Sequence, residues 1–284
     1  MKRFVLLAAA LMIGGAAEAA PEVGKATAIT VEVKGDAAGD IRTLKTGDQV
    51  FQEEVIATDA KGVGQFEFLD NTKLAIGPGS SVKLDRFVYG LDRTATAVSI
   101  QLTKGAFRFI SGKSASTAYQ IATPTATIGV RGTTFDVFVA DDGEMAVAMI
   151  NGGVDVCARR GSNACQRHDL VGRFLHLTPA GIISVRDRWD GTFLRTVSFT
   201  AALPFIARQN MLLPGFRATG NIAGGYLNAV PRHLLTGPAL APLRGVPQIV
   251  PNLLPNLGPA RGQKAGPKQK QRSGPGLPIP GLFR

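Results

Sequence analysis

Few residues in this chain have the types and spacing that catalysis requires. The three histidines, His168, His176 and His233, lie in unrelated sequence contexts, and no common nucleophile, zinc-protease or phosphate-loop motif occurs. Asp141 and Asp142 precede a glycine, which is typical of a turn between strands rather than of a catalytic carboxylate pair. We therefore predict that the protein is not an enzyme and that it needs no cofactor or metal.

Cys157 and Cys165 are the two cysteines, and the residues between them have the character of a hairpin tip. A disulfide would close this hairpin and, because the loop is short, would stabilise the fold by about 2–3 kcal/mol. A metal site is the alternative, since His168 follows three residues after Cys165. This spacing does not match a usual zinc site, so we favour the disulfide.

Arg131 stands between Gly129 and Gly132, in a run that begins with a rigid Thr-Pro-Thr sequence and continues as an alternating strand. The two glycines can hold a bulge or backbone positions with φ > 0. An arginine in such a strand is expected to meet a carboxylate or backbone carbonyls, and breaking a buried pair of this kind costs about 3–5 kcal/mol. The alternative is that Arg131 captures an anion, which makes it the candidate ligand- or partner-binding residue.

The last third of the chain is strongly basic. From residue 191 onward there are 11 Lys and Arg residues and no acidic residue, so the whole net charge of +11 lies there. Frequent prolines in the same part predict a disordered, extended tail over residues 214–284. Its densest basic cluster consists of Arg261, Lys264, Lys268, Lys270 and Arg272.

This basic cluster is a candidate site for an anionic polymer, a lipid surface or an acidic protein. Nucleic acid is not expected as a partner, because an exported protein rarely meets it. A solvated tail without a specific partner is the alternative.

Residues 1–19 predict a cleaved export signal. Lys2 and Arg3 precede an apolar stretch, and Ala17-Glu18-Ala19 has the small residues of a cleavage site. An uncleaved membrane anchor is the alternative, but the stretch is short for a span of about 20 residues. We expect a periplasmic protein without a transmembrane span in the mature chain, with secretion beyond the cell as the alternative.

Short strands are the elements that must position these residues. Pairs of apolar residues recur every eight residues, with turn sequences between them, at Phe66/Phe68, Leu74/Ile76 and Val82/Leu84. Alternation of this kind continues as far as Val156 and predicts strands that face a core on one side. The pattern indicates an all-β fold over residues 28–190, a single antiparallel-rich domain that is either a sandwich or a short solenoid.

Residues 191–213 differ from the strands and could form one apolar face. We expect this segment to pack over an open end of the β domain and to cover its edge. Docking to a membrane surface or a partner is the alternative, because arginines flank the apolar residues.

Six stretches of the chain match the sequence motifs of a known family and follow one another in the same order. They are residues 46–50, 65–74, 77–84, 104–113, 123–133 and 151–156. They include an Asp70-Asn71-Thr72 turn, in which Asn71 stands where glycine is common, and the glycines around Arg131. With these stretches, residues 28 to about 180 resemble the FecR domain family of bacterial envelope proteins. The resemblance implies a β domain for protein or ligand recognition and brings no catalytic residues.

The best-known members of that family are inner-membrane regulators of extracytoplasmic sigma factors, which receive a signal from an outer-membrane iron-siderophore transporter. Those regulators carry a cytoplasmic segment and a membrane span ahead of the β domain. Because only Met1, Lys2 and Arg3 precede the apolar stretch here, we do not expect direct control of a sigma factor.

We therefore interpret the chain as a non-enzymatic periplasmic recognition protein that acts in envelope signalling or sensing through an envelope protein partner. The alternative is a structural envelope protein, which its basic tail anchors to anionic cell-wall or outer-membrane polymers.

Overall fold

The computed structural model describes residues 20–161, 164–218 and 222–235 of the 284-residue chain. The expected export signal and the basic cluster that ends at Arg272 lie outside these residues. In the described part, the strands are β1 (Glu22–Thr30), β2 (Val33–Ala37), β3 (Asp40–Thr43), β4 (Gln49–Phe51), β5 (Val55–Thr58), β6 (Val63–Phe68), β7 (Lys73–Ile76), β8 (Ser81–Tyr89), β9 (Ala95–Ile110), β10 (Tyr119–Ala122), β11 (Ala126–Val139), β12 (Met145–Ala158), β13 (Cys165–His168), β14 (Phe174–Leu177) and β15 (Ile183–Arg186).

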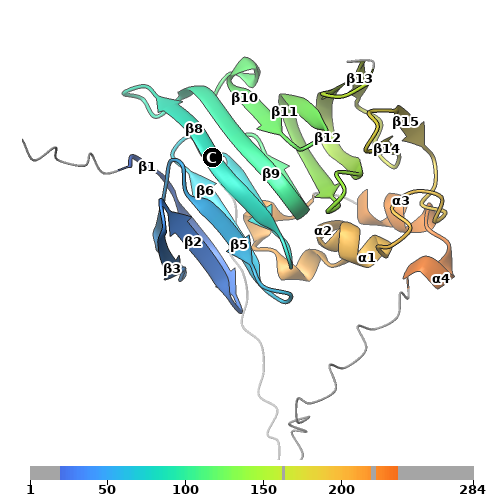
Figure 1. Cartoon of the computed structure of the whole chain (residues 1–284), viewed down its shortest axis with the longest axis horizontal. Helices are drawn as coiled ribbons and strands as arrows, with labels where there is room; N and C mark the ends of the chain where they lie inside the picture. Colours follow the sequence, from blue (N-terminus) through green and yellow to red (C-terminus); the bar gives the residue numbers. More distant parts are fainter. Residues whose placement is uncertain (1–19, 162–163, 219–221, 236–284) are drawn as a thin grey trace, which may run out of the picture. The chain divides into compact units, whose positions relative to one another are not determined.

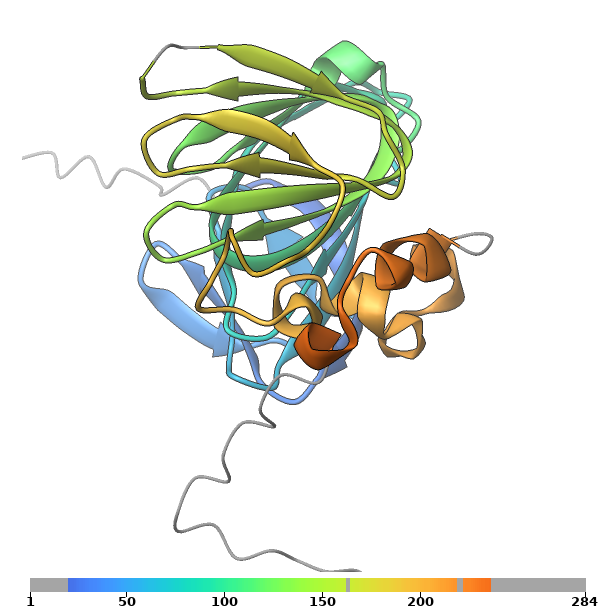
Figure 2. The ribbon, with the colours of Figure 1, turned by 90° about the vertical axis from the view of Figure 1, so that its right-hand side faces the viewer.

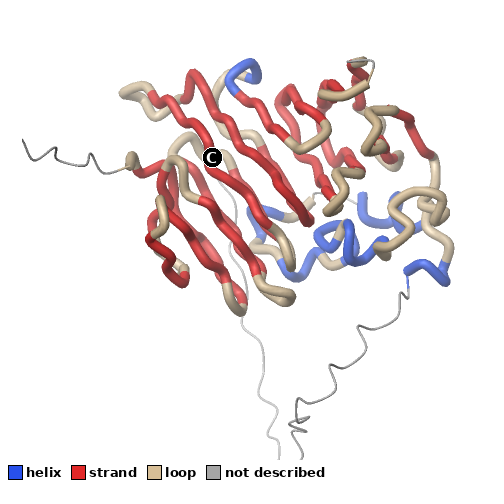
Figure 3. The backbone as a smooth tube through the Cα atoms, viewed as in Figure 1, coloured by secondary structure: helices blue, strands red, loops and turns tan. Residues whose placement is uncertain are grey.

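Short helices complete the described part of the chain (Figure 3). The α-helices are α1 (Phe199–Ala202), α2 (Pro204–Ala207), α3 (Ile222–Asn228) and α4 (Arg232–Leu235), and the 3-10 helices are η1 (Ser116–Ala118), η2 (Gln209–Met211) and η3 (Pro214–Phe216). No helix in residues 20–161, 164–218 and 222–235 has the length and apolar character of a membrane span.

The strands form one continuous sheet that folds back on itself as two facing layers (Figures 1 and 2). The covered layer has the strand order β15-β14-β12-β11-β9-β7-β6-β1-β4. The exposed layer has the order β13-β12-β11-β10-β9-β8-β5-β2-β3. Apart from β9 and β10, which run parallel, the paired strands of the described residues are antiparallel. The predicted all-β, antiparallel-rich fold is therefore confirmed, and its form is a sandwich.

Three long strands, β9, β11 and β12, cross from one layer into the other. Each crossing contains a glycine with positive φ. In β12, Gly152 has φ +79°, and a Cβ atom placed there would lie 2.5 Å from the carbonyl oxygen of Gly132 in β11. The register of β11 shifts between Arg131 and Thr134, so the bulge predicted at this glycine pair centres on Gly132. A larger residue at Gly152 would therefore collide with β11.

The core lies between the two layers and follows the predicted alternation. Inward side chains of both layers form one apolar cluster, in which Phe66 and Leu74 of the covered layer and Val82 of the exposed layer are at most 1% exposed. Facing layers of this kind bury alternate residues of each strand. The outward residues are left to solvent or to another part of the chain.

Residues 189–218 and 222–235 pack on the outer face of the covered layer, below the strands in Figure 1. Phe174 of β14 lies at the centre of an aromatic cluster with Trp189, Phe193, Phe199 and Tyr226, at ring-centroid distances from 5.2 to 6.2 Å. The hydroxyl of Tyr226 donates a hydrogen bond to the carbonyl oxygen of Met149 in β12, at 2.6 Å. We call residues 189–218 and 222–235 the covering segment.

The covering segment differs from the sequence-based expectation in two ways. It lies on a face of the sheet rather than over an edge, and it continues to Leu235 although a tail was expected from residue 214. Phe216 and Tyr226 are buried, so that boundary is wrong, as is the expectation that the folded part ends near residue 190. Helices of about one turn between prolines show no helical period, which explains the error. At the other end, β1 begins at Glu22, earlier than residue 28.

Candidate functional site

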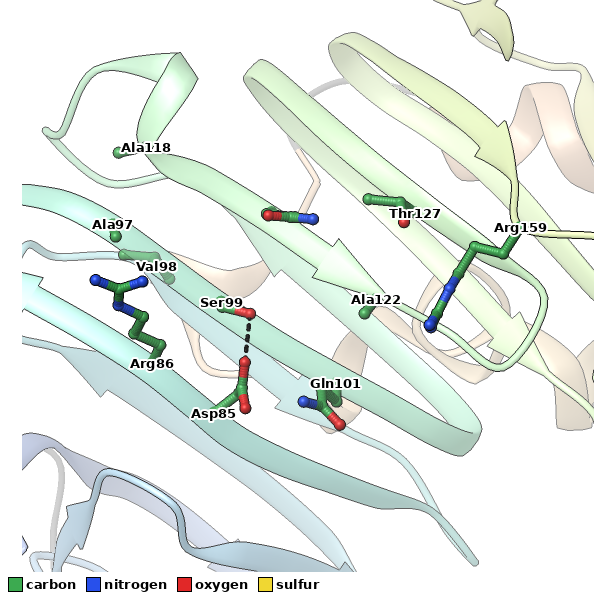
Figure 4. A pocket seen from close by; sticks show the side chains of 11 residues that line it. Asp85, Arg86, Ala97, Val98, Ser99, Gln101, Ala118, Ala122, Thr127 and Arg159 are labelled. Atoms are coloured by element: carbon green, nitrogen blue, oxygen red, sulfur yellow. Dashed lines mark hydrogen bonds between the residues drawn. The ribbon is translucent and has the colours of Figure 1, made fainter. Parts of the chain in front are cut away.

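The outer face of the exposed layer carries a groove that the covering segment leaves open (Figure 4). Its volume is 490 Å³, and it is lined by strands β8, β9, β10 and β11, by the end of η1 and by Arg159, the residue after β12. The polar lining residues are Asp85, Arg86, Ser99, Gln101, Gln120, Thr127 and Arg159. Ala97 and Ala122 add short side chains to the lining.

The groove offers charges of both signs and several hydrogen-bonding groups. Ser99 Oγ donates a hydrogen bond to Asp85 Oδ2 at 2.7 Å, and this bond is visible in Figure 4. Arg159 Nη1 donates to the carbonyl oxygen of Thr123 at 3.1 Å, which holds its guanidinium at the rim. Arg86 forms no ion pair within the described residues. A polar, open groove of this kind suits a protein or polar-polymer surface better than an apolar small molecule.

Arg131 lies on the same face, at its β11 end. Its Nε donates to Asp155 Oδ2 of β12 at 2.5 Å, so the arginine meets a carboxylate. The pair is on the surface rather than buried, because the Arg131 side chain is 59% exposed and that of Asp155 is 31% exposed. A shallow hollow of 240 Å³ beside the pair includes Tyr119 and Gly129. Whether Arg131 binds a ligand or partner stays a prediction.

The Asp-Asn-Thr turn between β6 and β7 is part of a buried hydrogen-bond network. Asp70 Oδ2 accepts hydrogen bonds from the hydroxyls of Thr72, Ser114 and Tyr119, at 2.7 to 2.9 Å. Asn71 has φ +67°, the conformation that explains the preference for glycine at this position. Burial raises the pKa of Tyr119. These residues join two distant stretches of the chain and are structural, because their polar atoms are satisfied by one another.

The histidines do not come together. His168 is in β13, His176 is in β14 and His233 is in α4. His176 Nε2 lies 2.7 Å from Glu144 Oε1, which also accepts a hydrogen bond from the backbone N–H of Leu194, so this pair fastens the covering segment. Among the residues that the structure describes, no group of three or more His, Cys, Asp or Glu residues could hold a metal ion.

Cys157 and Cys165 form a disulfide, as predicted. The two cysteines are directly opposite each other in the β12–β13 pair, so the bond closes the last hairpin of the exposed layer. A disulfide persists in oxidising compartments.

Residues 54–155 match the family model described as FecR protein. These residues form a FecR domain. The FecR domain contains strands β5 to β11 and most of β12, and with them the corner glycines, the Asp70 network and the groove, apart from Arg159.

Solved structures show weaker likeness to the chain. Two crystal structures of a candidate anti-sigma factor from Parabacteroides distasonis are each 18% identical in sequence to this chain and superpose on it with a TM-score of 0.37. Each match covers 46% of this chain and 58% of the anti-sigma factor chain. This chain thus spans little more than half of their length. A structure described as a cell surface anchoring domain is 30% identical over 23% of this chain and 87% of its own, with a TM-score of 0.22. No curated protein matches the chain.

Sequence reasoning missed one pair in the FecR domain, on the outer face of the covered layer. Arg108 Nε and Nη2 donate to the two carboxylate oxygens of Asp136, at 2.6 and 2.9 Å, and both side chains are at most 1% exposed. Arg108 Nη1 donates to Gln209 Oε1 and to the Phe216 carbonyl oxygen, at 3.2 Å each. Burial raises the pKa of the Asp136 carboxyl, and the Arg108 charge opposes that shift. The pair therefore anchors the covering segment to the FecR domain.

Proposed function

We propose that this protein is a non-enzymatic recognition module of the cell envelope, which takes part in signalling by binding a protein partner in the periplasm. The FecR match supports a role in signalling or regulation. The predicted export signal and the disulfide support an oxidising compartment outside the cytoplasm.

One observation carries the proposal. The covering segment buries the outer face of one layer, whereas the groove on the other layer remains open although it lies almost entirely within the FecR domain. Its charged groups of both signs, with Arg86 outside any ion pair of the described residues, favour a partner with complementary polar groups.

The test is photo-crosslinking in the cell, with the full chain and a crosslinking amino acid at Gln120 in the groove. The control has the same amino acid at Leu213, which is 40% exposed and lies in the covering segment, on the opposite outer face of the sandwich. We expect a defined protein partner to be captured from Gln120 but not from Leu213, and reciprocal capture from the tagged partner.

Charge reversal in the groove sharpens this test. Arg86→Glu should lower the crosslinking yield at Gln120 by about tenfold, the effect of losing roughly one buried charge interaction. Lys25→Glu, the matched change on exposed Lys25 of β1, should leave the yield unchanged. Equal capture from both positions, or a yield insensitive to Arg86→Glu, would count against the groove.

Anchoring by the basic tail is a second candidate function, and the uneven charge distribution favours it. All residues from 191 onward contain no acidic side chain to neutralise their 11 basic ones. Retention of the protein in washed cell envelopes should then fall with rising salt, because salt screens exposed charges. A chain ending at Leu235 keeps the described fold and should be released; if it is retained as firmly as the full chain, tail anchoring is wrong.

A further inference from the structure

Both ends of the sandwich have free strand edges. At one end, which we call the acidic end, β3 is the last strand of the exposed layer and β4 the last of the covered layer. At the opposite end, the basic end, β13 and β15 hold these places. The labels of β3 and of β13 and β15 lie at opposite sides of Figure 1. Edge strands present unpaired backbone N–H and C=O groups that can pair with another chain.

The acidic end has surplus negative charge. Residues 30–54 contain six acidic and three basic side chains. The glutamates of this stretch are in ion pairs, Glu32 with Lys34, Glu54 with Arg42 and Glu53 with Lys83. The aspartates Asp36, Asp40 and Asp48 form no ion pair within the described residues.

The basic end has the opposite charge. Residues 157–188 contain six arginines and two aspartates. Both aspartates are paired, Asp169 with Arg167 and Asp187 with Arg173. Arg160, Arg186 and Arg188 form no ion pair within the part of the chain that the structure describes. The Nε atom of Arg186 is buried, and no described group accepts a hydrogen bond from it.

Each end also exposes an isoleucine. Ile41 of β3 is 64% exposed at the acidic end, and Ile182, next to β15, is 65% exposed at the basic end. Between the β13 and β15 edges lies a hollow of 370 Å³, which Ala164, Ile182 and Ile183 help to line. The hollow has room for an aliphatic side chain from another molecule.

We propose that the basic end binds the acidic end of a second copy of this chain, so that the protein associates head to tail. Ile41 of one copy then enters the hollow beside Ile182 of the next, and Asp36, Asp40 and Asp48 face Arg160, Arg186 and Arg188. A contact between two identical ends would set like charges against each other. Because the two contacting surfaces differ, the assembly does not close at a dimer and grows as a row.

The test measures mass in solution by sedimentation, over protein concentrations up to about 1 mM, where even weak association is populated. For the full wild-type chain we expect an average mass that rises with concentration and falls with added salt. Two variants each block one end: Ile182→Asp alters the basic end and Ile41→Arg the acidic end. Both positions are more than half exposed, so the fold should tolerate them.

Each variant alone should remain a monomer, whereas an equal mixture of the two should form a dimer and nothing larger. Only in the mixture can one intact acidic end meet one intact basic end. Leu91→Asp, on the fully exposed β8–β9 turn, is the matched control and should assemble like the wild type. A wild type that stays monomeric, or a dimer that persists in either single variant, would overturn the proposal. A mixture that stays monomeric would overturn it too, and is the result expected if the basic tail of the same chain occupies the acidic end.

Discussion

The two outer faces of the sandwich differ although the same three long strands contribute to both. On β9, the outward side chain of Gln101 is exposed on one face, whereas that of Arg108, seven residues on, is fully buried on the other. The exposed layer presents a polar groove, and the covered layer presents apolar side chains and a buried ion pair. Alternation within a strand therefore identifies the outward residues, but a distant segment decides whether they meet water.

Removing the covering segment should break this contrast most severely. A chain ending at Asp190 loses Phe193, Phe199 and Phe205, each fully buried and contributing about 1.5–3 kcal/mol. The summed contribution of the three phenylalanines approaches the free energy of unfolding of a typical domain, which is about 5–15 kcal/mol. We expect the truncated chain to be insoluble or to unfold without cooperativity. Solubility measurements and urea denaturation test this. A chain ending at Leu235 should unfold as the full chain does, and a stable chain ending at Asp190 would refute the role of the segment.

The two arginine–aspartate pairs provide the next comparison. Arg108→Ala leaves the Asp136 carboxylate buried without its partner, and we expect the free energy of unfolding to fall by about 3–5 kcal/mol. Asp155→Ala, which breaks the surface pair with Arg131, should cost about 0–1 kcal/mol. Urea unfolding measures both. Similar losses in the two variants would mean that the covering segment does not exclude water from Arg108.

The glycine corners that join the two layers permit a third test. Gly152→Ala places a Cβ at φ +79° and 2.5 Å from the Gly132 carbonyl oxygen, so we expect a loss of about 1–3 kcal/mol. Gly129→Ala has no neighbouring atom nearer than 3.8 Å and should change stability by less than about 0.5 kcal/mol. Thermal unfolding of the two variants compares them directly. Equal stability would show that the corner does not need glycine.

The exposed layer ends in a buried histidine, which makes its stability depend on pH. Burial lowers the pKa of His168, so the folded protein resists a proton that the unfolded chain accepts below its ordinary pKa of 6.5. This contribution is complete above pH 6.5 and is lost as the pH falls toward the folded-state pKa. His168→Gln should therefore flatten the fall in unfolding free energy between pH 7 and pH 5, relative to the wild type. An unchanged slope would contradict the assignment.

The smallest effect is expected at Arg131. Because the side chain is 59% exposed, Arg131→Ala should change the free energy of unfolding by about 0–1 kcal/mol. If this residue contacts the partner, the variant should nevertheless reduce capture at Gln120 in the groove. A variant that is less stable but captures its partner normally would remove Arg131 from the binding surface.

Much of the β sandwich could be predicted from local sequence. Phe66 and Phe68 alternate with polar residues and face the core, and the Cys157–Cys165 spacing indicated a hairpin disulfide that the structure contains. These features depend on residues close together in the chain, where the period of a strand and the chemistry of a turn act directly.

The parts that sequence reasoning missed depend on distant residues. Arg108 and Asp136 are on separate strands, and their outward positions ordinarily indicate contact with water. Nothing near either residue indicates that residues 205–216 return over them. The available signal for this ion pair was the opposite charge of two outward residues on long strands. It indicates a pair only once β9 and β11 are known to align Arg108 with Asp136.

The crossing of β9, β11 and β12 has a mechanical consequence. In a sandwich of two separate sheets, the layers are held by side-chain contacts and can slide over each other. Here the backbones of β9, β11 and β12 are continuous through both layers. A shearing force on one layer is therefore resisted by covalent backbone that continues into the other. A pull applied across the layers should thus meet a single stiff body that yields all at once.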